Sequence, residues 1–107
     1  MIRAFRSEYF AAIAIALARF VFCCYRAIHQ AMVIDEAYCF ERFLSGPWSR
    51  IYSQYDASNH VLYSILARLS IQILGLSEFS LRLPSLLAGF FLTLGIFHVL
   101  RSTAPPP

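Results

Sequence analysis

The stretch from Leu83 to Leu100 reads LPSLLAGFFLTLGIFHVL and contains no Asp, Glu, Lys or Arg. An apolar run of about 18 residues or more is long enough to be a transmembrane helix. Pro84 suits the first turn of such a helix, because its missing N–H has no intrahelical partner to lose there. The stretch therefore predicts a membrane-spanning helix over residues 83–100.

Two further apolar segments precede it. The first covers residues 9–28, and a helix of about 20 residues measures about 30 Å, the thickness of the hydrocarbon core. Arg19 lies near the middle of this segment. A charged side chain at that depth needs a partner or a watery cavity, so we expect another helix to pack there. The second segment covers residues 59–74 and ends before Gly75, a typical helix stop.

The first segment has a competing interpretation as a signal peptide. Arg3 and Arg6 resemble its basic region, and Ala16-Leu17-Ala18 resembles a small-x-small cleavage site. The apolar run resumes after Arg19 and continues to Tyr25, which favours a transmembrane helix.

The composition points to lipid as part of the solvent. The chain has 107 residues, 59% of them hydrophobic and only 14% charged, whereas soluble domains are about a quarter charged. Its length allows one domain at most. The sequence therefore predicts an all-α membrane protein with three transmembrane helices.

The basic residues argue against a nucleic-acid partner. The formal net charge is +3, all nine basic residues are arginines, and they are scattered through apolar segments. Nucleic-acid binders gather such charge on one face. The three cysteines, Cys23, Cys24 and Cys39, have no zinc-binding spacing. We interpret Cys23 and Cys24 as ordinary lipid-facing or packing residues and Cys39 as a candidate free thiol in the loop.

The sizeable polar region is the loop over residues 30–58. Its first half keeps a helical pattern that Gly46-Pro47 breaks, and the aromatics Trp48, Tyr52 and Tyr55 favour a membrane interface. We expect one or two short helices on the membrane surface. The positive-inside rule favours a cytoplasmic N-terminus, which places this loop on the extracytoplasmic side of the plasma (inner) membrane. The tail over residues 102–107 reads as disordered.

An acidic pair, Asp35-Glu36, begins the loop. Because charges are costly in hydrocarbon, carboxylates collect in surface loops or polar cavities. Asp35 at the mouth of a helix bundle is a candidate general base, with a pKa raised by low local dielectric, or a ligand of Mg²⁺ or Mn²⁺. The alternative is a solvated loop carboxylate. Neighbouring side chains on a helix point apart, so we expect one of the pair to act and the other to support it.

Asn59 and His60 open the second segment, and both are candidate contacts for the substrate or its lipid phosphate. His60 is a candidate metal ligand or phosphate contact, and the alternative is a polar residue at a helix entry. Arg26 is a candidate partner for a lipid phosphate, since guanidinium suits phosphate oxygens, and the alternative is snorkelling to the interface. Glu78 and Arg82 are four residues apart, and we interpret them as a stabilising helical pair.

The order of these motifs resembles the N-terminal part of GT-C membrane glycosyltransferases, of the family 39-like type. That type includes dolichyl-phosphate-mannose protein mannosyltransferases and aminoarabinose transferases. Three pieces carry the resemblance: Asp35-Glu36-Ala37-Tyr38, then Asp56 with Asn59-His60-Val61-Leu62-Tyr63, then Ser77 to Gly89. Val61 stands where relatives often have proline.

The resemblance implies transfer of a sugar from a polyprenyl-phosphate donor to an acceptor at the outer membrane face. It gives Asp35 the catalytic acidic role, with Glu36 assisting. Relatives have many more spanning helices, so the resemblance also implies that this chain is a fragment, inactive without the missing remainder of the enzyme. The alternative is a small three-span membrane scaffold or binding subunit, for which Asp35 is dispensable.

Overall fold

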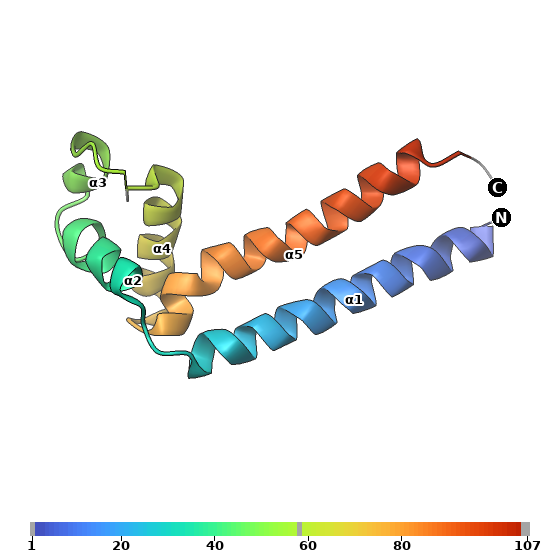
Figure 1. Ribbon diagram of the computed structural model, residues 1–107, viewed down its shortest axis with the longest axis horizontal. Coiled ribbons are helices and arrows are strands. Elements are labelled where there is room, and N and C mark those ends of the chain that lie inside the picture. Colours follow the sequence, from blue (N-terminus) through green and yellow to red (C-terminus); the bar gives the residue numbers. More distant parts are fainter. Residues whose placement is uncertain (1, 58, 106–107) are drawn as a thin grey trace. The chain divides into compact units, whose positions relative to one another are not determined.

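The computed structural model describes residues 2–57 and 59–105, and every regular element in that part of the chain is a helix. In chain order the elements are α1 (Ile2–His29), α2 (Ile34–Cys39), the π-helix η1 (Phe40–Leu44), α3 (Ser49–Ser53), α4 (Val61–Leu74) and α5 (Glu78–Thr103) (Figure 1). The chain divides into two compact units, the first made of Met1–Tyr25 and Leu86–Pro107 and the second of Arg26–Ser85. The prediction of an all-helical fold is confirmed.

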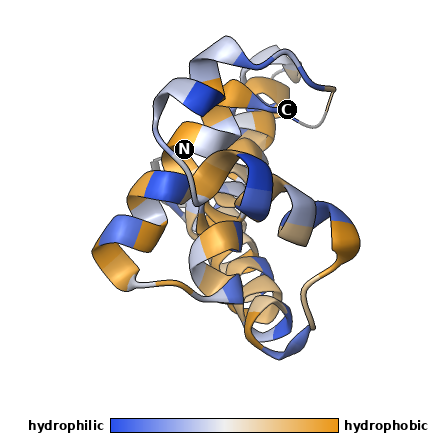
Figure 2. Ribbon diagram, turned by 90° about the vertical axis from the view of Figure 1, so that its left-hand side faces the viewer, coloured by the Kyte–Doolittle hydropathy of each residue, from blue (hydrophilic) through white to orange (hydrophobic). Residues whose placement is uncertain are grey.

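Two helices of the described chain, Arg6–His29 within α1 and Glu78–Thr103, are long and apolar enough to cross a membrane. The short helices α2, α3 and α4, which face the viewer in Figure 2, carry both hydrophilic and hydrophobic residues. The helix expected over residues 59–74 is α4, which has 14 residues. At 1.5 Å per residue it measures about 21 Å, short of the roughly 30 Å hydrocarbon core. By length and composition the structure thus supports two of the three predicted spans.

The predicted start and end of the last helix need correction. Ser77 Oγ accepts a hydrogen bond from the Ser80 N–H at 3.0 Å, which caps the helix N-terminus so that α5 begins at Glu78. Pro84 therefore lies inside the helix rather than in its first turn. At the other end, the predicted disorder over residues 102–107 is wrong for Ser102 and Thr103, which belong to α5. Residues 106 and 107 of that prediction lie outside the described part of the chain.

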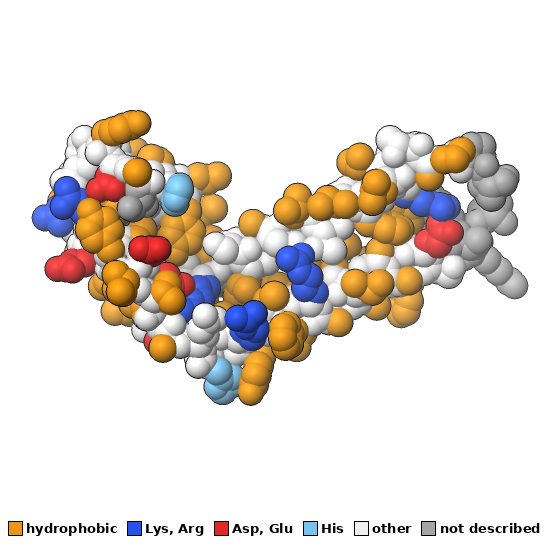
Figure 3. Space-filling view, viewed as in Figure 1, with side chains coloured by type: hydrophobic (Ala, Val, Ile, Leu, Met, Phe, Trp, Pro, Cys, Tyr) orange, Lys and Arg blue, Asp and Glu red, His pale blue; other side chains and the backbone are white. Residues whose placement is uncertain are grey.

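In the first unit, the N-terminal part of α1 runs beside the C-terminal part of α5 (Figure 1). Arg19 Nη1 donates to Thr93 Oγ1 at 2.6 Å and to the Gly89 carbonyl at 3.4 Å. Nearer the termini, Tyr9 Oη and His98 Nδ1 are 3.0 Å apart. The expectation that another helix supplies a partner for Arg19 is confirmed. Hydrophobic side chains cover much of the visible face of this helix pair (Figure 3).

The second unit packs the predicted loop against α4. Phe43 and Ile51 are fully buried with Cys39, and Trp48 and Tyr63 pack against them. Phe43 lies on η1 and Ile51 on α3, so the short helices expected over residues 30–58 are confirmed, as is the break at Gly46-Pro47 between them. That they lie on a membrane surface stays a prediction.

Gly75 ends α4, as expected, in a conformation that requires glycine. Its φ of 84° and ψ of 168° fall in a region that side chains with a Cβ avoid, and it is the C-cap of the helix. Gly75→Ala should lower the free energy of unfolding by about 1–3 kcal/mol, the usual cost of such strain.

Thermal unfolding followed by circular dichroism checks this expectation, with Gly95→Ala as the matched control. A Cβ added at either glycine meets no atom within 4 Å. Because Gly95 is inside a helix with ordinary backbone angles, alanine there should not destabilise the protein. Equal effects of the two substitutions would contradict the role given to Gly75.

Candidate functional site

Helix α2 begins at Ile34, so the acidic pair lies in its first turn, and Glu36 stabilises that turn. Val33, which precedes the helix, has extended backbone angles, and its N–H donates to Glu36 Oε2 at 3.1 Å. Acidic residues in a first turn also interact favourably with the helix dipole. Asp35 is exposed, whereas Glu36 is half-buried. The two carboxylates thus have different environments, as expected for adjacent residues of a helix.

Glu36 forms a two-bond ion pair with Arg82. Arg82 Nε donates to Glu36 Oε1 and Arg82 Nη2 donates to Glu36 Oε2, both at 2.6 Å. The side chains are only 14% and 22% exposed. The hydrogen bonds from Arg82 hold the pKa of the Glu36 carboxyl below its ordinary value. Glu36 is therefore a structural anchor for α2.

The remaining N–H groups of Arg82 are also satisfied. Nη1 donates to the carbonyls of Ala27 at 2.9 Å and Gln30 at 2.8 Å, and Nη2 donates to the Ala31 carbonyl at 3.1 Å. All five guanidinium donors thus have acceptors. The last carbonyls of a helix lack intrahelical partners, so Arg82 both caps the end of α1 and connects it to α2. We call Arg82, Glu36 and these three carbonyls the Arg82 clamp.

The clamp predicts a pH dependence of stability. Because the pKa of Glu36 is lower in the folded state than in the unfolded state, ionised Glu36 stabilises the fold above the unfolded value of about 4.3. That contribution is lost as the pH falls through the folded pKa. Melting of the second unit, followed by fluorescence of Trp48, the one tryptophan of the sequence, should show this acid loss.

Glu36→Gln is the control for this expectation. It should melt at a lower temperature at neutral pH and lose less stability in acid than the wild type does, because it has no carboxylate to protonate. Parallel acid profiles for the two proteins would contradict the assignment.

Asp35 and His60 share one open pocket of about 360 Å³. Its lining, which defines the Asp35 pocket, consists of Asp35, Glu36, Cys39, Ala57, His60 and Tyr63. His60 immediately precedes α4 and is exposed. Cys39 is a free, buried cysteine, and burial raises the pKa of its thiol, so it supplies little thiolate. The structure thus brings together the two residues that the sequence singled out from separate motifs.

Asn59 and Arg26 do not line this pocket. The Asn59 amide nitrogen donates to the Ile51 carbonyl at 2.8 Å and to the Gln54 carbonyl at 3.1 Å, so it holds α3 against the start of α4. Asn59 therefore positions its neighbour His60. Arg26 is exposed near the end of α1, and its contact with a lipid phosphate stays a prediction.

Asp56, from the same motif, lies near α2 and η1. Tyr38 Oη donates to Asp56 Oδ2 at 3.0 Å, and Arg42 Nε is 3.6 Å from the same oxygen. The hydrogen bond to Asp56 raises the pKa of the Tyr38 phenol. Asp56 thus connects the segment before α4 to α2 and η1.

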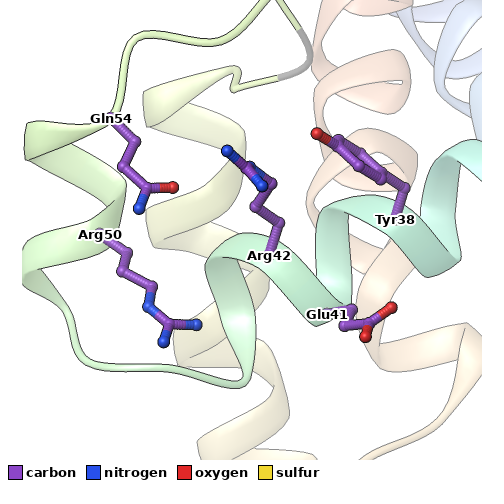
Figure 4. Close-up of a pocket in the computed structure, with 5 residues that line it drawn as sticks. All are labelled: Tyr38, Glu41, Arg42, Arg50 and Gln54. Carbon is purple, nitrogen blue, oxygen red and sulfur yellow. The ribbon is translucent and has the colours of Figure 1, made fainter.

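A second pocket, of about 490 Å³, lies on the same unit. Its lining, which defines the arginine pocket, consists of Tyr38, Glu41, Arg42, Arg50 and Gln54 (Figure 4). Neither arginine was assigned a role at a site from the sequence. No spacing rule brings them together, because the turn at Gly46-Pro47 sets the approach of α3 to η1.

No protein-family model, curated protein or solved structure matches the chain.

Proposed function

We propose that the chain takes part in transferring a sugar from a polyprenyl-phosphate donor to an acceptor hydroxyl, outside the plasma (inner) membrane. The observation that carries this proposal is the shared pocket of Asp35 and His60, which come from two separate motifs. The donor is a lipid, and the two long apolar helices support a membrane setting. Residues 30–58 then lie on the extracytoplasmic side.

The chemistry assigned to the pocket is a single displacement. Asp35 accepts the proton of the acceptor hydroxyl, whose oxygen bonds to the anomeric carbon of the sugar. The bond from that carbon to the phosphate oxygen breaks, and the lipid phosphate leaves with the electron pair. His60 faces the phosphate and donates a hydrogen bond to it. Glu36 assists by holding α2, because both of its oxygens are engaged in the Arg82 clamp.

A divalent cation, Mg²⁺ or Mn²⁺, was expected to bind Asp35 and His60. Mg²⁺ requires near-octahedral coordination by oxygen ligands. Among residues 2–57 and 59–105, no group of three or more His, Cys, Asp or Glu side chains is placed to hold a metal ion. Binding of Mg²⁺ or Mn²⁺ by Asp35 and His60 stays a prediction, and the displacement above is written without a cation.

The membrane-facing surfaces support a need for further helices. Large apolar side chains of both long helices remain exposed, among them Phe10 at 76%, Ile15 at 65% and Phe91 at 64%. Lipid or neighbouring helices would cover them. The proposal is that additional membrane helices enclose the donor and that the chain alone is inactive. The same exposure favours the second candidate, a membrane scaffold or binding subunit without catalysis.

The two candidates are separated in the membranes in which the chain is naturally made. Removal of the chain should abolish transfer of a labelled sugar from the lipid-linked donor, and the wild-type chain should restore it. A catalytic role predicts that Asp35→Asn fails to restore transfer. A scaffold role predicts full restoration by the same variant.

A further inference from the structure

The arginine pocket brings two guanidinium groups to one polar hollow. Arg42 lies on η1, whereas Arg50 lies on α3 and Gln54 directly follows that helix. All three residues line this one pocket. In the close-up, the Arg42 guanidinium and the Gln54 amide extend toward each other, whereas the Arg50 guanidinium extends toward the turn between η1 and α3 (Figure 4). Two cations and an amide around one space are suited to an anion with several acceptor oxygens.

Gly46 leaves room for one of these arginines. A Cβ added at Gly46 would lie 2.7 Å from Arg50 Nη1 and 2.9 Å from Arg50 Cδ, closer than real Cβ atoms approach other atoms. The side chain of Arg50 therefore folds over the glycine at the turn between η1 and α3. A larger residue at position 46 would force the guanidinium to move away.

The charges around the pocket leave the guanidinium groups available. Arg42 is 51% exposed, and its ion pair with Asp56 uses Nε, at 3.6 Å. Arg50 is exposed, and no acidic group within the described chain forms an ion pair with it. Glu41 also lines the pocket, but its carboxylate points away from both guanidinium groups (Figure 4). The two guanidinium groups can therefore donate hydrogen bonds to a ligand, and the Glu41 carboxylate does not face them.

Gln54 adds an unsatisfied polar group. Its Oε1 atom is buried, and no residue of the described chain is its hydrogen-bond partner. Buried polar atoms without a partner are uncommon and costly. Because amide oxygen and nitrogen exchange places by a flip of the side chain, Gln54 can donate to an anion or accept from a hydroxyl attached to it.

We propose that the arginine pocket binds a phosphate group through Arg42, Arg50 and Gln54. The phosphate belongs either to the headgroup of an anionic membrane lipid or to a soluble phosphate. Planar guanidinium groups bind phosphate oxygens in pairs, which suits them to this ligand. The site is separate from the Asp35 pocket and does not depend on the transfer reaction proposed for it.

Calorimetric titration of the full chain in neutral detergent tests the site. One arm adds inorganic phosphate, and the other adds phosphatidylglycerol, with phosphatidylcholine as its control. Arg50→Gln and Arg42→Gln should each weaken binding at least about fivefold, as expected for the loss of a charge-assisted hydrogen bond. Glu41→Gln should strengthen binding about twofold, because it removes a negative charge that repels the phosphate.

Two variants separate a specific site from a general effect of charge or folding. Arg6→Gln removes an equal charge from the other unit and should leave binding unchanged. Arg50→Lys keeps the charge but loses the planar guanidinium with its paired donors. Its affinity for phosphate should therefore lie between those of the wild type and Arg50→Gln. Binding of inorganic phosphate would support a soluble ligand, and binding of phosphatidylglycerol alone would support a lipid headgroup. No binding of either probe, or equal weakening by Arg6→Gln and Arg50→Gln, would overturn the proposal.

Discussion

Asp35→Asn is expected to lower sugar transfer at least about 100-fold, the lower end of the contribution of a general base. The carboxylate is exposed in the first turn of α2 and lines the same pocket as His60. Asparagine keeps the shape of the side chain but cannot accept a proton at neutral pH. Transfer is measured with labelled lipid-linked sugar in the membranes in which the chain is naturally made.

Two observations show that a loss of transfer reflects chemistry. Glu78→Gln removes a carboxylate from the first turn of α5, outside both pockets, and should leave transfer unchanged. Asp35→Asn should lower the free energy of unfolding reported by Trp48 by no more than about 1 kcal/mol, since Asp35 is exposed and the substitution removes only its interaction with the helix dipole. Undiminished transfer by Asp35→Asn would rule out its role as the base.

Arg82→Ala should strongly destabilise the second unit, with a loss of about 2–4 kcal/mol in the free energy of unfolding. Removing one member of a buried pair costs about 3–5 kcal/mol, and partial exposure of this pair lowers that figure. The change leaves Glu36 without its partner and leaves three backbone carbonyls without their donor. Chemical unfolding followed by Trp48 fluorescence measures the loss.

Arg82→Lys and Arg101→Ala make this prediction specific. Lysine keeps the charge but has three donors where the clamp uses five, so Arg82→Lys should recover only part of the loss. Arg101 forms an ion pair with Glu8, and these two side chains, 35% and 43% exposed, are more exposed than those of the Arg82–Glu36 pair. Arg101→Ala should therefore cost about 0–1 kcal/mol. If Arg82→Lys had the same free energy of unfolding as the wild type, the claim that the clamp needs all five guanidinium donors would be refuted.

Most helix positions follow from local patterns. Long apolar runs located α1, α4 and α5, and glycine chemistry located two of the helix ends, at Gly75 and at Gly46-Pro47. The predicted start of α5 was wrong because it placed Pro84 in the first turn of the helix. Ser77 caps the helix earlier, and the proline is accommodated inside it.

Only part of the candidate site could be predicted from the sequence. Asp35 and His60 were chosen from motif order and do share a pocket. Arg82 was assigned to Glu78 because residues four apart on a helix are neighbours. Its hydrogen bonds go instead to Glu36, across 46 positions of sequence, and to the end of α1. The arginine pocket could not be predicted from sequence spacing, because a turn brings its lining residues together.

The sequence by itself determined the helical class, two helices able to cross a membrane, and an acidic pair at the start of a structured loop. These properties depend on composition and on contacts within a few residues, which periodicity and capping rules describe. Only the tertiary structure decided that Glu36 is an anchor while Asp35 remains exposed, and that two arginines face one pocket. Such pairings depend on where distant segments pack, because a guanidinium accepts any carboxylate or carbonyl that the fold brings within reach.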